Sequence, residues 1–368
     1  MKKIITLIIA ISMTLVSCDN DFNDLNVDPT ASTNLDLNPK FAYLFLKSAA
    51  EEVELSYTSI LCNGQLVQQV IDQQFPQSSI YTNREDLQSA WWITQYTTTI
   101  KTVVDIINQL EAEGNVGTEM GIARMWKVFI FHVLVDQYGD TPYFQAGRGF
   151  LDGVVRPVYD DDQVIYMDML NELEQAVAQI GGSSTLGSSD LVFNGDTNKW
   201  KKFGNSLMLR LAMRIKNVDP TGSNTWAQKA IDGGTMSSNE DTAFMTHTDG
   251  PTDLNRNAWG TYQPRYSFAR IGATLYDWLE SNGDPRLNIL ADPNGPAAGN
   301  RYGLENDQLL AIYGESPESY ARVNSAITQL NSPWIFLSYA QTALLEAELA
   351  AAAGDHTSAE AKYNSGVR

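Results

Sequence analysis

One stretch of the chain gathers aromatic and planar polar side chains among residues that favour irregular structure. Between positions 255 and 266 it carries Asn255, Arg256, Asn257, Trp259, Tyr262, Arg265 and Tyr266. The flat C–H faces of a sugar ring stack on Trp and Tyr rings, while sugar hydroxyls need amide or guanidinium groups beside them. We therefore predict a ligand site for a carbohydrate or similar small nutrient in this stretch.

Trp259 is the first candidate for that site, followed by Tyr262 and Tyr266. Asn255, Asn257 and Arg265 would supply the polar edge. Tyr81, from a separate polar loop at 72–83, would join them. The alternative interpretation is that these side chains only pack a loop against the rest of the fold.

Residue types found in catalytic and metal sites are present, but not at the spacings that such sites need. His132, His247 and His356 stand far apart, and none has a metal-ligating partner at helical spacing. The sequence has no phosphate-binding loop and no nucleophile-elbow motif. Carboxylates are plentiful, yet nothing singles out two of them as a glycosidase pair. We therefore expect no enzymatic activity, no cofactor and no metal site.

Three consecutive aspartates, at 160–162, precede a segment of helical periodicity. Acidic side chains favour a helix N-terminus, where they accept hydrogen bonds from free backbone N–H groups. We interpret the run as a helix cap. A calcium site there would need further oxygen ligands from elsewhere in the chain.

The most apolar stretch of the mature chain lies at residues 118–143. From 125 to 135 only Lys127 and His132 interrupt the apolar run, which is shorter than the roughly 20 residues that cross a bilayer. It predicts a helix over 118–138 that other helices bury on most sides. Gly139 should end this helix in a left-handed conformation, and Pro142 prevents its resumption. His132 is expected to be a hydrogen-bonded core residue.

Periodicity predicts further helices over 35–71 (with a break around Asn63-Gly64), 87–113, 163–180, 198–216, 226–231, 269–280, 334–353 and from 357 onwards. Several neighbours look antiparallel, and the last two resemble a tetratricopeptide unit. Gly, Pro, Asn and Asp crowd residues 233–333, which hold only one clear helix; long irregular regions usually carry function. The predicted fold is mostly all-α: a tetratricopeptide-like scaffold (39–232), a loop-rich ligand-binding insertion (233–332) and a truncated helical pair (333–368).

The N-terminus has the features of an export signal. Lys2 and Lys3 precede an apolar core at 4–16, and Ser17-Cys18 follows. Apolar and small residues before a cysteine resemble a bacterial lipobox, in which Cys18 is acylated and becomes the mature N-terminus. Residues 1–17 would be the signal peptide and 18–38 the lipidated tether. Cys62 then lacks a partner and is expected to be buried on a helix.

Composition narrows the class of partner. Hydrophobic residues make up 43% of the chain, which excludes a disordered protein. The formal net charge of −19 should repel nucleic acid and anionic lipid. Neutral partners such as sugars are compatible with this charge.

An ordered set of motifs resembles a known family. After the lipobox come Leu25-Asn26-Val27-Asp28-Pro29-Thr30, Trp92-x3-Tyr96, Arg124-Met125-Trp126, Asp136-Gln137-Tyr138-Gly139-Asp140-Thr141-Pro142-Tyr143, Asp284-Pro285-Arg286-Leu287 and Glu346-Ala347-Glu348. The set is similar to the SusD/RagB family of nutrient-binding outer-membrane lipoproteins, nearer its SusD-like second subfamily, across residues 1–368. Family members usually continue with more C-terminal helices, so the resemblance implies a C-terminally incomplete chain.

The resemblance implies a lipid-anchored outer-membrane protein, on the cell surface, without enzymatic activity. It would bind an oligosaccharide or similar nutrient and hand it to a SusC-like TonB-dependent transporter. The alternative is a non-catalytic helical protein–protein scaffold of the outer membrane, in which the aromatic residues only pack.

The lipobox generates a direct test in a host that exports the protein. Cys18→Ala should abolish incorporation of a fatty-acid probe and release the protein from the membrane fraction, because acyl chains would be its attachment. Cys62→Ala is the matched control and should label like the wild type. Equal labelling of Cys18→Ala and wild type would overturn the predicted localisation.

Overall fold

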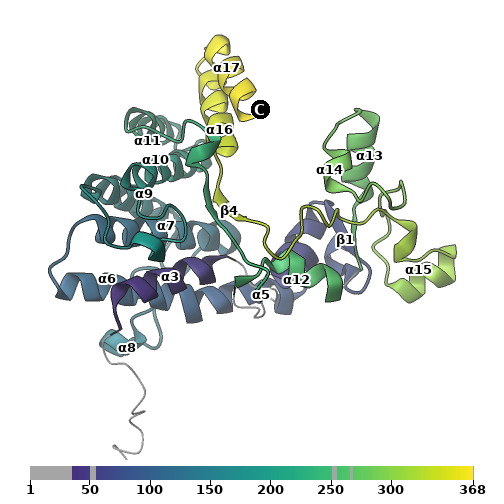
Figure 1. The fold of residues 1–368 in the computed structure, drawn as a ribbon, viewed down its shortest axis with the longest axis horizontal. Coiled ribbons are helices and arrows are strands. Elements are labelled where there is room, and N and C mark those ends of the chain that lie inside the picture. Colours follow the sequence, from purple (N-terminus) through teal and green to yellow (C-terminus); the bar gives the residue numbers. More distant parts are fainter. Residues whose placement is uncertain (1–34, 50–54, 251–254, 266–267, 368) are drawn as a thin grey trace, which may run out of the picture. The chain divides into compact units, whose positions relative to one another are not determined.

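The computed structural model describes residues 35–49, 55–250, 255–265 and 268–367 (Figure 1). Residues 38–368 form one compact unit, within which all the contacts below lie. None of the helices in these ranges is long and apolar enough to cross a membrane. The signal peptide, Cys18 and most of the predicted tether lie outside the described residues.

Helices dominate the described ranges, which confirms the predicted mostly α fold. The longer helices are α3 (Leu37–Ser48), α5 (Glu85–Thr94), α6 (Lys101–Ala112), α7 (Thr118–Tyr138), α9 (Asp162–Gln179), α10 (Thr197–Arg214), α11 (Pro220–Asp232), α12 (Ala258–Arg265), α13 (Ala273–Ser281), α15 (Asn306–Tyr313), α16 (Tyr339–Ala352) and α17 (His356–Gly366). The one-turn helices are α8 (Gly149–Asp152) and α14 (Leu287–Leu290), and the π-helical segments are η1 (Leu55–Gly64) and η3 (Gln95–Ile100). The 3-10 turns are η2 (Pro76–Ile80), η4 (Gly187–Ser189), η5 (Asn239–Asp241) and η7 (Pro317–Ser319).

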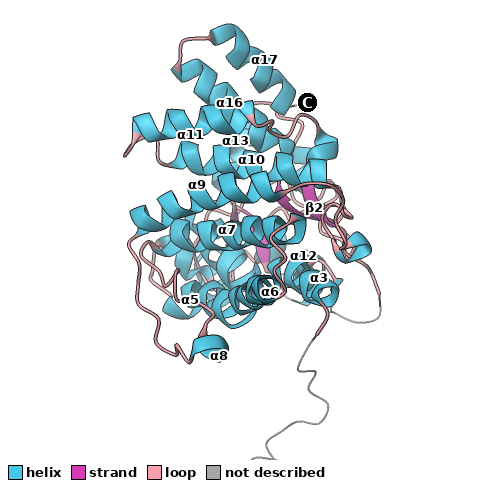
Figure 2. Cartoon of the chain, turned by 90° about the vertical axis from the view of Figure 1, so that its left-hand side faces the viewer, coloured by secondary structure: helices cyan, strands magenta, loops and turns pink. Residues whose placement is uncertain are grey.

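The predicted helical pairs are present. α6 packs on α7, α9 packs on α10, and α16 packs on α17, while α7 also contacts α9. Figure 2 shows α7, α9, α10 and α11 as successive layers. Each helix thus buries its apolar face against the next, as in a tetratricopeptide-like array.

Helix α7 is the centre of this array, and its limits are those that the sequence predicts. The Trp126 side chain is fully buried, meets the Phe45 ring edge-on at 4.8 Å, and donates from Nε1 to Ser48 Oγ at 2.8 Å. Gly139 ends the helix with φ 73° and ψ −130°, so φ is positive as expected although ψ lies outside the left-handed helical region. Only glycine adopts such a conformation readily.

Two short antiparallel strand pairs correct the predicted helices. β1 (Val70–Asp72) pairs with β3 (Ala269–Ile271), and β2 (Ala243–Met245) pairs with β4 (Trp334–Leu337). The helices predicted over 35–71, 269–280 and 334–353 are therefore wrong at these strands, although the break expected around Asn63-Gly64 coincides with the end of η1. Short apolar runs have no decisive periodicity, so a partner strand far along the chain determines their structure.

Two other predictions of helix content are incomplete. The helix predicted at 226–231 is α11, which begins at Pro220, because Asp219 caps it by accepting the Gly222 N–H at 2.9 Å. The Asp-Pro pair thus opens α11, whereas α10 has already ended at Arg214. The region 233–333, for which one helix was predicted, also contains α12, α14 and α15.

His132 is buried on α7, as predicted, but the expected hydrogen bond is not found. Its side chain is 1% exposed, and neither ring nitrogen has a well-formed hydrogen bond among the residues described. Burial, with the nearby cations of Arg210 and Arg214, lowers the pKa of the His132 imidazole to about 3.

This lowered pKa predicts sensitivity to acid. Between a folded pKa of about 3 and an unfolded pKa of ~6.5, only the unfolded chain binds the proton, so stability falls as the pH falls. His132→Leu removes this linkage. The unfolding free energy of the wild type, relative to the variant, should drop by about 2 kcal/mol between pH 7 and pH 5 in urea titrations.

His356→Leu, at an exposed position on α17, is the matched control and should leave the pH dependence unchanged. Parallel pH profiles for the wild type and His132→Leu would contradict the assignment of a buried, neutral imidazole.

Candidate functional site

The aromatic residues singled out by the sequence lie on and around α12, which packs against η1. A cluster of buried side chains forms there, which we call the aromatic-lobe core: Ile60, Leu61, Cys62, Leu87, Ala258, Tyr262 and Ala269. Cys62 is buried on a helix, as predicted. The partly buried indoles of Trp91, Trp259 and Trp334 pack against this core. The lobe thus presents several rings on a common apolar base.

Trp259 and Tyr262 have different positions on this base. Their rings meet edge-on with centroids 6.3 Å apart, but Trp259 is only partly buried whereas Tyr262 is 2% exposed. The Tyr262 hydroxyl donates to Asp72 Oδ2 at 2.8 Å. Tyr262 therefore links α12 to β1, and its buried ring contacts the partly exposed ring of Trp259.

Asp72 is the buried partner that fixes this arrangement. Its side chain lies in the interior, and its Oδ1 accepts the backbone N–H groups of Gln74 at 2.9 Å and Phe75 at 3.1 Å. Burial raises the pKa of the Asp72 carboxyl, while the Tyr262 hydroxyl and these two N–H groups oppose that shift. The hydrogen bonds offset part of the desolvation cost of a carboxylate in the interior.

The two predicted amides are engaged within the fold. Asn257 is buried, donates from Nδ2 to the Ser332 carbonyl at 3.0 Å, and accepts the Trp259 N–H on Oδ1 at 2.9 Å. Asn255 Oδ1 lies 3.0 Å from Nδ1 of His247. Both amides therefore fix the start of α12, and a role for either in ligand binding stays a prediction.

Tyr81 reaches the edge of the same lobe from the loop after η2. Its side chain is 70% exposed, its backbone has φ 58°, and its hydroxyl lies 3.4 Å from the Leu66 carbonyl oxygen. Leu66 packs against the aromatic-lobe core, so Tyr81 contacts the same lobe that carries Trp259. Ile80 and Val67 are also exposed beside Tyr81. The side chain of Arg265 and all of Tyr266 lie outside the described residues.

The sequence did not select Trp91 or Trp334 as site residues. Trp91 lies on α5, and its indole nitrogen is buried without a hydrogen-bond partner among the residues described. Trp334 was placed in a helix, whereas it begins β4. Its position against the aromatic-lobe core depends on the pairing of β4 with β2, for which the local sequence carries no signal.

The aspartate run at 160–162 confirms the cap interpretation. Asp161 Oδ1 accepts the N–H groups of Gln163 at 3.0 Å and Val164 at 3.2 Å, at the start of α9. Asp140 Oδ1 accepts the Asp162 N–H at 3.0 Å. The exposed carboxylates of Asp140, Asp161 and Asp162 therefore lie close together. These contacts are accounted for by helix capping and give no separate support for a calcium site.

With this geometry established, comparison with known proteins identifies the family. A family profile described as SusD-like, starch-binding and associating with outer membrane, matches residues 37–368. The chain belongs to this SusD-like family. The predicted resemblance to its second subfamily is thereby confirmed.

Solved structures have the same fold as this SusD-like chain. A chitin-binding protein is 28% identical, with a TM-score of 0.78 over 90% of this chain and 74% of that one. A SusD homologue from Bacteroides uniformis is 24% identical, with a TM-score of 0.75 over 91% of this chain and 70% of its own. A chitin-binding SusD homologue from Flavobacterium johnsoniae is 22% identical, with a TM-score of 0.74, covering 90% and 69%. No curated protein sequence matches significantly.

The Tyr262–Asp72 hydrogen bond generates a test of which aromatic residues are structural. Tyr262→Phe should lower the unfolding free energy by about 1–3 kcal/mol, because a buried carboxylate loses one donor. Chemical denaturation at neutral pH measures this loss. Tyr81→Phe is the control, and should change stability little since its hydroxyl lies at an exposed edge. Equal stability of Tyr262→Phe and wild type would remove Asp72 from its supporting role.

Proposed function

We propose that this SusD-like protein binds an oligosaccharide on the surface bordered by Trp259 and Tyr81, and delivers it to a SusC-like TonB-dependent transporter. The observation that supports this most directly is the partly exposed indole of Trp259, held on the packed base of a lobe that the 70% exposed Tyr81 also contacts. Flat rings at the edge of an apolar base suit the faces of pyranose rings.

The rigidity of this surface favours binding. Asn257 fixes the backbone at Trp259, and Tyr262 supports its ring through the hydrogen bond to Asp72. A ring that is already held in place loses little conformational freedom when a ligand stacks on it. Asn255, Arg265 and Tyr266 would complete the polar and aromatic edge.

The first ligand to test is a chito-oligosaccharide. Two structural relatives are chitin-binding proteins by their names, and the family is described as starch-binding. The function also requires attachment through an acylated Cys18 and a transporter partner, both of which the family description as an outer-membrane protein supports.

Calorimetry with chitohexaose and maltohexaose tests the proposed surface. Trp259→Ala should weaken binding of the recognised sugar by about ten-fold or more, equivalent to ~1.4 kcal/mol, because the stacking ring is lost. Tyr81→Ala should have a smaller effect in the same direction.

Trp278→Ala is the matched control, because Trp278 is a 54% exposed tryptophan on a different helix, α13. Its affinity should equal that of the wild type. Unchanged sugar binding by Trp259→Ala would reject this surface. Co-purification with a transporter, without binding of any glycan, would favour the protein–protein scaffold instead.

A further inference from the structure

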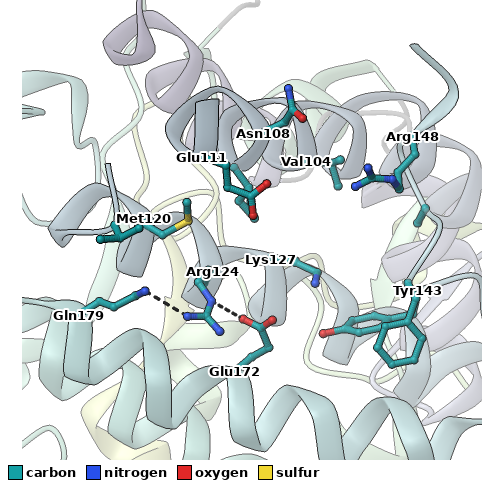
Figure 3. Close-up of a pocket in the computed structure, with 14 residues that line it drawn as sticks. Val104, Asn108, Glu111, Met120, Arg124, Lys127, Tyr143, Arg148, Glu172 and Gln179 are labelled. Atoms are coloured by element: carbon teal, nitrogen blue, oxygen red, sulfur yellow. Dashed lines mark hydrogen bonds and ion pairs between the residues drawn. The ribbon is translucent and has the colours of Figure 1, made fainter. Parts of the chain in front are cut away.

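A separate cavity of about 350 Å³ lies among α6, α7, α9 and the segment that follows α7 (Figure 3). This volume is at the lower end of the range of ~300–1,000 Å³ that small-molecule sites occupy. None of its lining residues belongs to the aromatic lobe described above. The cavity is therefore a second candidate site, of a size suited to a small ligand.

Part of the cavity wall is fixed and electrically balanced. Arg124 Nε donates to Glu172 Oε2 at 2.6 Å, and its terminal nitrogens donate to Gln179 Oε1 at 3.2 Å and Gln175 Oε1 at 2.9 Å. Arg148, at the other end, forms an ion pair with Asp152. Neither guanidinium is left with an uncompensated charge to offer a ligand.

Lys127 differs from these cations. Its ammonium lies 4.5 Å from the centroid of the Tyr143 ring, and it has no hydrogen bond or ion pair within the described part of the chain. The Tyr143 ring is 2% exposed and therefore a rigid support. A ring face stabilises the charge without using its N–H donors, so those donors remain free for an anionic group.

Glu111 and Asn108 project from α6 on the side of the cavity opposite Lys127 (Figure 3). Their side chains also have no hydrogen-bond or ion-pair partner among the residues described. Val104, Ile107 and Met120 contribute apolar wall. The cavity thus combines one unpaired cation, one unpaired anion and an apolar wall.

We propose that this cavity binds a small zwitterion of the α-amino acid class with an apolar side chain. Its carboxylate pairs with Lys127, its ammonium pairs with Glu111 and Asn108, and its side chain contacts the apolar wall. A simple anion would be repelled by Glu111, and a simple cation by Lys127. A neutral sugar would leave both opposite charges without an ionic partner. This site is independent of the proposed glycan surface.

A matched set of three ligands separates these contributions by calorimetry: L-leucine, 4-methylpentanoate, which lacks the amine, and 3-methylbutylamine, which lacks the carboxylate. L-Leucine should bind at least ten-fold more tightly than either analogue. Lys127→Met should weaken L-leucine by ten-fold or more, whereas Lys127→Arg, which keeps the charge, should retain most of the affinity. Glu111→Gln should weaken L-leucine and strengthen 4-methylpentanoate, because a repulsive charge is removed.

Lys101→Met is the matched control, since Lys101 also lies over an aromatic ring, 4.4 Å from the centroid of Phe150, but outside the cavity. It should bind L-leucine like the wild type, and so should Trp259→Ala, which separates this proposal from the glycan surface. The proposal is overturned if L-leucine does not bind at millimolar concentration, if Lys127→Met binds it unchanged, or if 4-methylpentanoate binds equally well.

Discussion

Close approach of the helices around α7 leaves no space for a side chain at two glycine positions. A Cβ atom on Gly121 would lie 2.7 Å from the Ala176 carbonyl oxygen of α9, and one on Gly204 of α10 would lie 2.5 Å from Met125 Sδ. At Gly121 the obstacle is backbone, so the close α7–α9 approach requires glycine there; at Gly204 the nearest atoms belong to the side chains of Met125 and Val177, which fill the space that a side chain would need. Because a densely packed interior is hardly compressible, the positions of these helices constrain the elements that pack on them.

Both candidate sites depend on this packing. Helices α6, α7 and α9 form the walls of the charged cavity, so its width follows from the distances between them. The Phe336 ring of β4 meets Trp126 of α7 edge-on at 4.9 Å, and β4 begins with Trp334, which packs against the aromatic-lobe core. The aromatic lobe is therefore connected to the central helix through β4, and its rings are held on a fixed base.

The two sites also illustrate different ways of stabilising polar groups near an interior. In the aromatic lobe two buried polar side chains are paired: Asp72 with Tyr262 and two backbone N–H groups, and Asn257 with Ser332 and Trp259. In the cavity, Lys127 faces a ring and Glu111 faces open space. Paired groups fix a structure, whereas groups with remaining hydrogen-bonding capacity can recognise a ligand.

The sequence could predict several residues of the candidate site, but not how their side chains are oriented or buried. The sequence selected Trp259 and Tyr262 together because aromatic and amide residues crowd this stretch, yet composition does not determine which ring faces solvent. That difference arises from Asp72, which lies 190 residues away and receives the Tyr262 hydroxyl. The engagement of Asn257 with Ser332 is another contact between distant residues that no local pattern records.

The sequence by itself determined α7 to its terminal residues, the helical pairs, a helix cap within residues 160–162 and the family. These features depend on helical hydrogen bonds between residues four apart, on local end signals such as Gly139, and on an ordered set of motifs. Only the tertiary structure decided that 70–72, 269–271 and 334–337 are strands. It also decided that the Lys127 ammonium lies over the Tyr143 ring in the wall of a cavity. Strand pairing and cavities depend on chain segments brought together from distant positions, because short apolar runs fit a helix or a strand equally well until a partner is present.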